Sequence, residues 1–166
     1  MEERTHSQNG KGLVKVSFPL EPGQWPDLEA ENMWAEPVRP GKYRVENVPF
    51  YAYDVSAEDV VDASPRDGVL TFTGISERGG HSTYRLLLSD GISTHDPRFL
   101  THWSQLQSMG CSYEGANSKW LAVDVPPRAD IYRVYSMLEE GQDEAIWSFD
   151  EGHCGHPVVK PKVRND

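Results

Sequence analysis

The first half of the chain alternates short apolar runs with turns that contain glycine or proline. Pro40-Gly41 and Asp67-Gly68 are typical of tight turns between strands. Because no helical apolar period appears here and the runs are short and closely spaced, the pattern predicts a small β-barrel or a strongly bent antiparallel sheet. The runs expected to form strands are residues 13–18, 33–38, 42–46, 60–63 and 69–74.

Two amphipathic helices are predicted in the second half, where apolar residues recur at helical spacing. The first begins after Asp96, a capping residue, and Pro97, which suits the first helical turn, and Gly110 is expected to end it. Gly141 is expected to end the second helix. The periodic positions are Phe99, Leu100, Trp103 and Leu106 in the first helix and Ile131, Val134, Tyr135 and Leu138 in the second.

Four further runs complete an alternating order of strands and helices. They are residues 83–89, 111–114, 119–125 and 146–150, so the order from Thr83 is β-α-β-β-α-β, which is the ferredoxin-like unit. The expected fold class is α+β, with an N-terminal small β-barrel or bent antiparallel sheet followed by this unit. The expected organisation is a disordered lead-in at 1–12, a β-rich half at 13–80, the ferredoxin-like half at 81–151 and an extended tail at 152–166.

Strand alternation also predicts how the two halves meet. Trp120, Ala122 and Asp124 share one face of the strand at 119–125, and that face must pack on the N-terminal half or bind a partner. We therefore expect Trp120, together with Leu87, to be buried against the N-terminal half.

The charge balance narrows the class of partner. The 166 residues include 26 Asp and Glu against 16 Lys and Arg, a net charge of −10 that repels phosphate backbones, and the aromatic pattern of RNA-binding sheets is missing. No apolar run approaches the roughly 20 residues of a membrane span. With only two cysteines, Cys111 and Cys154, the sequence favours a cytoplasmic protein with reduced thiols and no nucleic-acid or membrane partner.

The most chemically dense stretch surrounds a glycine pair. Arg78, His81, Ser82, Thr83 and Arg85 lie within eight residues of one another. A Ser/His nucleophile is disfavoured, because neighbouring residues of an extended chain point to opposite faces and the nucleophile-elbow motif is absent. No phosphate-cradling motif is present either. We assign no catalytic residue; the candidate binding residues are Arg78, His81, Ser82, Thr83, Arg85, Glu114 and Trp120.

Three ligand-type residues near the C-terminus raise the question of a metal. His153, Cys154 and His156 lie within four residues, but a structural zinc site normally takes its ligands from two separated pairs. Cys111 belongs to the second strand of the ferredoxin-like unit, at the sheet edge opposite Cys154. We therefore assign no metal and no cofactor.

Five short sequence motifs follow one another along most of the chain. They are Val14-Lys15-Val16-Ser17-Phe18-Pro19-Leu20, Met33-Trp34-Ala35-Glu36-Pro37, Tyr43-Arg44-Val45-Glu46-Asn47-Val48-Pro49-Phe50, Arg78-Gly79-Gly80-His81-Ser82-Thr83 and Leu121-Ala122-Val123-Asp124-Val125-Pro126-Pro127. In these motifs and in their order the chain resembles the bacterial family named domain of unknown function 4265. The resemblance implies no activity, cofactor or catalytic residue.

Two functional hypotheses follow from these patterns. The first is a non-catalytic cytoplasmic protein-binding module, such as an immunity protein or an inhibitor of a basic partner, because the chain is small, acidic and without a catalytic constellation. The alternative is a small enzyme or ligand sensor that uses the polar segment from Arg78 to Arg85. A pocket lined by His81 and Arg85 would favour the alternative.

Overall fold

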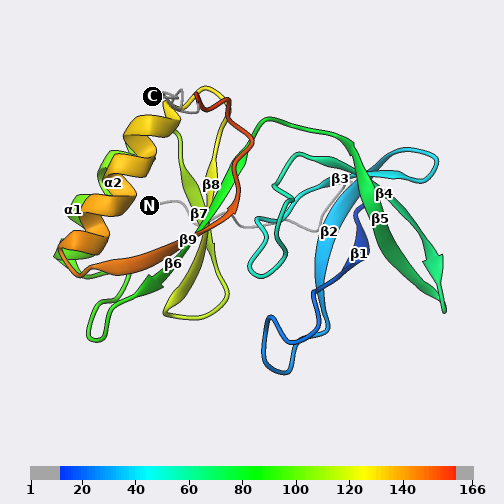
Figure 1. Ribbon diagram of the computed structural model, residues 1–166, viewed down its shortest axis with the longest axis horizontal. Coiled ribbons are helices and arrows are strands. Elements are labelled where there is room, and N and C mark those ends of the chain that lie inside the picture. Colours follow the sequence, from blue (N-terminus) through cyan, green and yellow to red (C-terminus); the bar gives the residue numbers. More distant parts are fainter. Residues whose placement is uncertain (1–11, 160–166) are drawn as a thin grey trace, which may run out of the picture.

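The N-terminal half closes into a five-stranded barrel, as the strand pattern predicts. The computed structural model describes residues 12–159, so the expected disordered lead-in lies almost wholly outside the described residues. Sequential strands pair antiparallel, and β5 closes on β1 through a parallel pair between Ser17 and Thr71 (Figure 1, right). The strands are β1 (Val14–Pro19), β2 (Ala30–Arg39), β3 (Lys42–Val45), β4 (Val60–Arg66) and β5 (Val69–Glu77).

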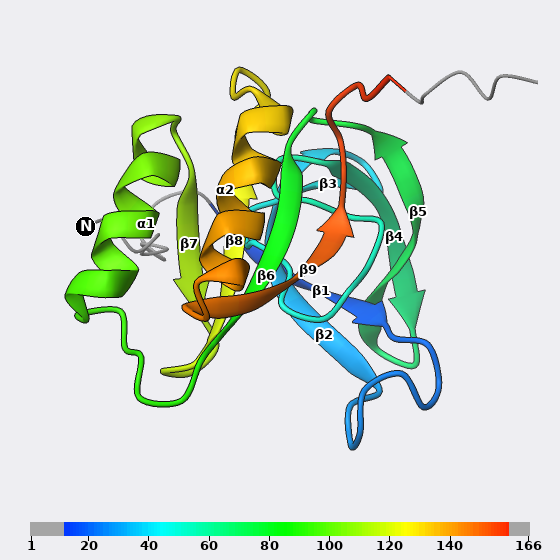
Figure 2. The same ribbon diagram turned by 60° about the vertical axis from the view of Figure 1, so that its left-hand side comes forward.

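The C-terminal half is a four-stranded antiparallel sheet with both helices on one face (Figures 1 and 2). The strand order across the sheet is β7-β8-β6-β9. Large side chains such as Phe99, Trp103 and Trp147 are buried between the helices and the sheet. The elements are β6 (Ser82–Leu88), α1 (Pro97–Ser108), β7 (Ser112–Gly115), β8 (Trp120–Val125), α2 (Ile131–Asp143) and β9 (Trp147–His153).

The start signals of the first helix are confirmed, whereas the expected end of the second helix is wrong. The carboxylate of Asp96 accepts a hydrogen bond from the backbone N–H of Arg98, and Pro97 opens α1. Gly141, however, lies inside α2 and is buried. A Cβ there would lie 2.3 Å from the Trp147 ring, so this glycine allows close packing instead of ending the helix.

Residues 46–59, between β3 and β4, pack on the second face of the C-terminal sheet. Val48 and Ala57 pack on Ala122 of β8. The carboxylate of Glu31 fixes the segment by accepting hydrogen bonds from three consecutive backbone N–H groups, those of residues 50–52, at 2.7–3.0 Å. The two halves are therefore joined by packing as well as by the chain connection.

Trp120 and Leu87 were expected to be buried against the N-terminal half, and this expectation is only partly met. Trp120 is half-buried, packs edge-on against Trp25 with ring centroids 5.9 Å apart, and donates its indole N–H to the Phe50 carbonyl. The expectation for Leu87 is wrong, because its side chain is 46% exposed. Leu87 pairs with Trp120 and Ser148 near the C-terminal end of β6.

The described residues form no helix that is both long enough and apolar enough to cross a membrane. Cys111 and Cys154 are both free thiols, and burial raises the pKa of the Cys111 thiol to about 12.

Candidate functional site

The linker segment, residues 78–81, joins the barrel to the second sheet and is anchored on a buried carboxylate. Asp59 is fully buried. It accepts hydrogen bonds from the backbone N–H groups of Ser56 (2.9 Å) and Gly79 (2.8 Å) and from Nη1 of Arg78 (3.0 Å). A buried carboxylate is tolerated when several donors satisfy it, so these bonds hold the junction in one geometry.

The backbone is strained where the linker segment meets residues 46–59. Asp54 and Glu58 have φ of 62° and 70°, in the left-handed region. Arg78 donates to the carbonyl of Asp54, and a Cβ at Gly79 would lie 2.6 Å from the carbonyl oxygen of Glu58. Only glycine therefore fits at position 79, and the strain is maintained by contacts with the linker segment.

His81 is a linker residue that uses one ring nitrogen for a hydrogen bond within the described chain and leaves the other available to a ligand. Its Nδ1 lies 2.9 and 3.1 Å from the two carboxylate oxygens of Asp124, which is buried on β8. Because a carboxylate accepts, Nδ1 carries a proton, and when the imidazole is neutral Nε2 therefore presents a lone pair. Among the residues that the structure describes, Nε2 has no hydrogen-bond partner.

His81 lines a cavity of about 490 Å³ at the junction of the two halves. Arg78 uses Nη1 for both of its protein contacts, and its side chain is 43% exposed. Nη1 of Arg44 lies 3.4 Å from Oε2 of Glu36, so this ion pair is a long one. The cavity thus combines two guanidinium groups with an oriented imidazole, and its remaining lining is Glu58, Val60, Glu77 and Gly79.

Ser82 forms a Ser–His pair, but with a histidine 74 residues away. Its Oγ donates to Nδ1 of His156 (2.6 Å) and accepts from the backbone N–H of Gly155 (2.9 Å), while Nε2 of His156 donates to the Pro126 carbonyl (2.9 Å). Ser82 is fully buried. The pair therefore fastens residues 153–156 to β6, and the expected extended tail begins later than residue 152.

The other candidate residues are structural contacts between the halves. Thr83 is buried and shares a hydrogen bond with Ser56 (2.7 Å). Arg85 is fully buried, donates to the Ala52 carbonyl (2.9 Å) and lies over the Tyr53 ring. The Glu114 carboxylate accepts from the backbone N–H of Val48. Of the candidates, only Arg78 and His81 line the junction cavity.

The three C-terminal ligand-type residues have separate environments. Nε2 of His153 is buried without a partner in the described chain, and burial, then the charge of Arg78, lowers the pKa of His153. Cys154 lies 3.6 Å from the His156 carbonyl oxygen. No group of three or more His, Cys, Asp or Glu side chains within residues 12–159 is placed to hold a metal ion.

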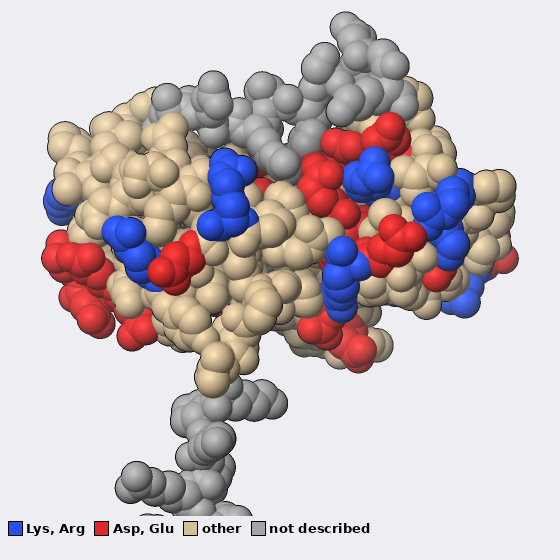
Figure 3. All heavy atoms as spheres, turned by 90° about the horizontal axis from the view of Figure 1, so that it is seen from above, with Lys and Arg blue, Asp and Glu red and all other residues tan. Residues whose placement is uncertain are grey.

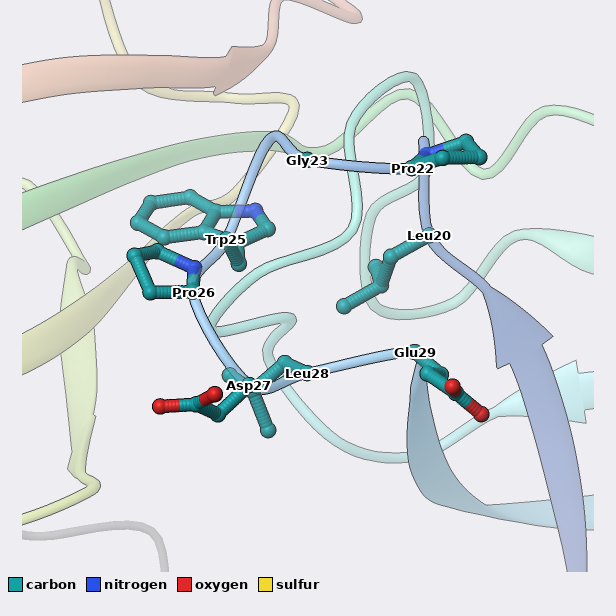
Figure 4. Close-up of a pocket in the computed structure, with 8 residues that line it drawn as sticks. All are labelled: Leu20, Pro22, Gly23, Trp25, Pro26, Asp27, Leu28 and Glu29. Atoms are coloured by element: carbon teal, nitrogen blue, oxygen red, sulfur yellow. The ribbon is translucent and has the colours of Figure 1, made fainter.

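A hollow of about 820 Å³ is ringed by a single loop between β1 and β2 (Figure 4). Leu20 points into the ring, whereas the carboxylates of Asp27 and Glu29 point away from it (Figure 4). This hollow lacks the convergent polar groups typical of a small-molecule site.

Charges are mixed over the face seen in Figure 3. Basic and acidic side chains alternate over the barrel, and acidic ones gather at the outer edge of the helical half. The acidic side chains are therefore unevenly distributed over this face (Figure 3).

Comparisons with known proteins identify the fold and a family. A family model described as "Domain of unknown function (DUF4265)" matches residues 31–149. The solved structure described as "Novel crystal structure of a hypothetical protein from Neisseria gonorrhoeae" is similar with a TM-score of 0.73 at 16% identity, over 92% of this chain and 99% of that one. No curated protein matches.

Proposed function

Since the chain belongs to the DUF4265 family, whose description names no activity, we propose from its geometry that it binds a small anionic molecule in the junction cavity. The observation that carries this proposal is His81, oriented by buried Asp124 beside Arg78. A cavity at the junction of two halves, with convergent polar groups, is where ligands usually bind. Arg44 and Arg78 would pair with a carboxylate or phosphate.

The His81–Asp124 pair adds proton-transfer chemistry to this binding site. With its proton on Nδ1, the ring can accept a proton from the ligand at Nε2, and the Asp124 carboxylate stabilises the imidazolium that results. A small enzyme or a ligand sensor at this cavity would use His81 as the proton acceptor and the arginines to position the anion.

The test is a thermal-shift screen of phosphate- and carboxylate-bearing small molecules, followed by titration calorimetry of any hit. His81→Asn keeps an amide N–H for Asp124 but removes Nε2, and it should weaken the hit roughly tenfold. Arg44→Gln should act similarly. The matched controls, His95→Asn and Arg66→Gln, change exposed residues outside the cavity and should bind normally. An anion that binds His81→Asn as tightly as the parent protein would refute the site.

A second candidate is the binding of a basic protein partner, as a cytoplasmic bacterial immunity protein or inhibitor would. The favouring observation is the loop at 20–29, which carries Glu21, Asp27 and Glu29, no basic residue, and an exposed Leu28. Charge complementarity there suits a basic surface.

A pull-down from native cells is expected to recover one stoichiometric basic protein whose affinity falls as salt rises. Leu28→Ser should weaken the purified complex, and Val69→Ser, another exposed apolar residue, should not. Repeated recovery of no partner at low salt would exclude this candidate.

We also propose that the unit from β6 to β9 is ferredoxin-like. Its alternation of strands and helices and the order β7-β8-β6-β9 support this assignment.

A further inference from the structure

A second cavity, of about 470 Å³, lies between α2 and the chain segment that follows β9. Among residues 12–159 it shares no lining residue with the junction cavity. Its walls combine aromatic rings and carboxylates, and the described residues that line it include no lysine or arginine. The lining residues that matter are Tyr84, Tyr132, Tyr135, Glu139 and Glu151.

The aromatic wall is held in place by ring contacts. Tyr135 packs edge-on against Phe149, with centroids 5.5 Å apart, and against Tyr84 at 6.3 Å. Its side chain is still 42% exposed. Tyr132 is fixed from the other side, because its hydroxyl accepts a hydrogen bond from the backbone N–H of Val159 (2.8 Å). Aromatic rings that are both positioned and accessible can offer a face to a cation.

Two carboxylates give the cavity its charge. Glu151 accepts a hydrogen bond from the hydroxyl of Tyr84 (3.0 Å). Burial, then the charge of Glu151, raises the pKa of Tyr84, so the phenol stays a neutral donor. Glu139 lies one helical turn after Tyr135 on α2. Both carboxylates are therefore placed beside tyrosine rings, and no basic side chain is among the described residues of this lining.

We propose that this cavity binds an organic ammonium group. Tyrosine faces attract a cation through their quadrupole, and carboxylates complete the charge pairing. The aromatic lining suits alkyl groups on nitrogen better than a bare metal ion, which requires several oxygen ligands. The group could be carried by a small amine or by a lysine side chain, and the two sources share this chemistry. The proposal is independent of ligand binding at the junction cavity.

Titration of the full chain by NMR tests the site with four probes. Choline and Nα-acetyl-lysine methylamide should both shift the Tyr132 and Tyr135 signals, and the tighter of the two identifies the source. Nα-acetyl-trimethyllysine methylamide shows whether N-alkylation helps. The neutral isostere of choline, 3,3-dimethylbutan-1-ol, should bind at least roughly fivefold more weakly than choline, because it lacks the charge.

Variants distinguish the contribution of the tyrosine ring to ammonium binding from the contributions of its hydroxyl group and of the overall negative charge. Tyr135→Phe keeps the ring and should retain affinity within roughly twofold, whereas Tyr135→Leu should lose fivefold or more. Glu139→Gln should weaken binding; Glu140→Gln removes the same charge one residue along, outside the cavity, and should not. Equal binding of the neutral isostere, no effect of Tyr135→Leu, or no ammonium binding at millimolar concentration would overturn the proposal.

Discussion

Replacing Asp59 with alanine is expected to lower the free energy of unfolding by about 3–5 kcal/mol. The carboxylate is fully buried and accepts from two backbone N–H groups and from Arg78. Its removal leaves the N–H groups of Ser56 and Gly79 without an acceptor and a guanidinium without its counterion. Urea unfolding measures the loss as a lower midpoint at an unchanged m-value.

Asp62→Ala is the matched control for this prediction. Asp62 pairs with Lys42 at 2.5 Å, but its side chain is 42% exposed. Loss of such a surface pair costs about 1 kcal/mol or less. If Asp59→Ala costs no more than Asp62→Ala, the buried anchor is not what fixes the linker segment, and the orientation of Arg78 in the junction cavity needs another cause.

Local patterns predicted most of the elements, because the signals that form them lie within a few residues. The cap and first turn of α1 come from Asp96-Pro97, and the alternating positions of β8 place Ala122 and Asp124 on the face that meets the N-terminal half. The β1–β5 strand runs and their turns likewise led to the barrel. These features depend on the spacing of apolar residues and on turn residues, and both can be read from a short stretch of sequence.

The candidate site was less predictable, because its bonds join residues far apart in the chain. Arg78 and His81 were found from local chemical density, but Asp59 and Asp124, which orient them, lie 19 and 43 residues away. A pair of Ser82 with its neighbour His81 was disfavoured, but the histidine that the fold does supply, His156, lies 74 residues away and could not be identified from the sequence. Gly141 was misjudged for the same reason, since the ring that requires a glycine there belongs to β9.

The cavity between α2 and the segment that follows β9 was also not predictable from local patterns. The helical period of α2 marked Tyr135 as part of an apolar stripe with Ile131, Val134 and Leu138. Tyr135 lies at the edge of that stripe, and Glu151 reaches the cavity from another element. A periodic pattern identifies a face, but not what lies opposite to it.

Gly155→Ala is expected to detach the segment that follows β9, at a cost of about 3 kcal/mol. A Cβ at this position would lie 2.2 Å from the carbonyl oxygen of His81, and a backbone atom cannot move aside as a side chain could. Detachment would break the three bonds that Ser82 and His156 make, each worth about 1 kcal/mol. Hydrogen exchange should show lost protection at Gly155, with the sheet core unchanged.

Gly74→Ala is the matched control, because an added Cβ there meets no atom within 4 Å, and it should change the free energy of unfolding by no more than about 0.5 kcal/mol. Because Cys154 and Val158 line the cavity beside α2, Gly155→Ala should also lose ammonium binding. If Gly155→Ala and Gly74→Ala have the same free energy of unfolding, the attachment of residues 153–156 to β6 does not depend on the glycine at position 155.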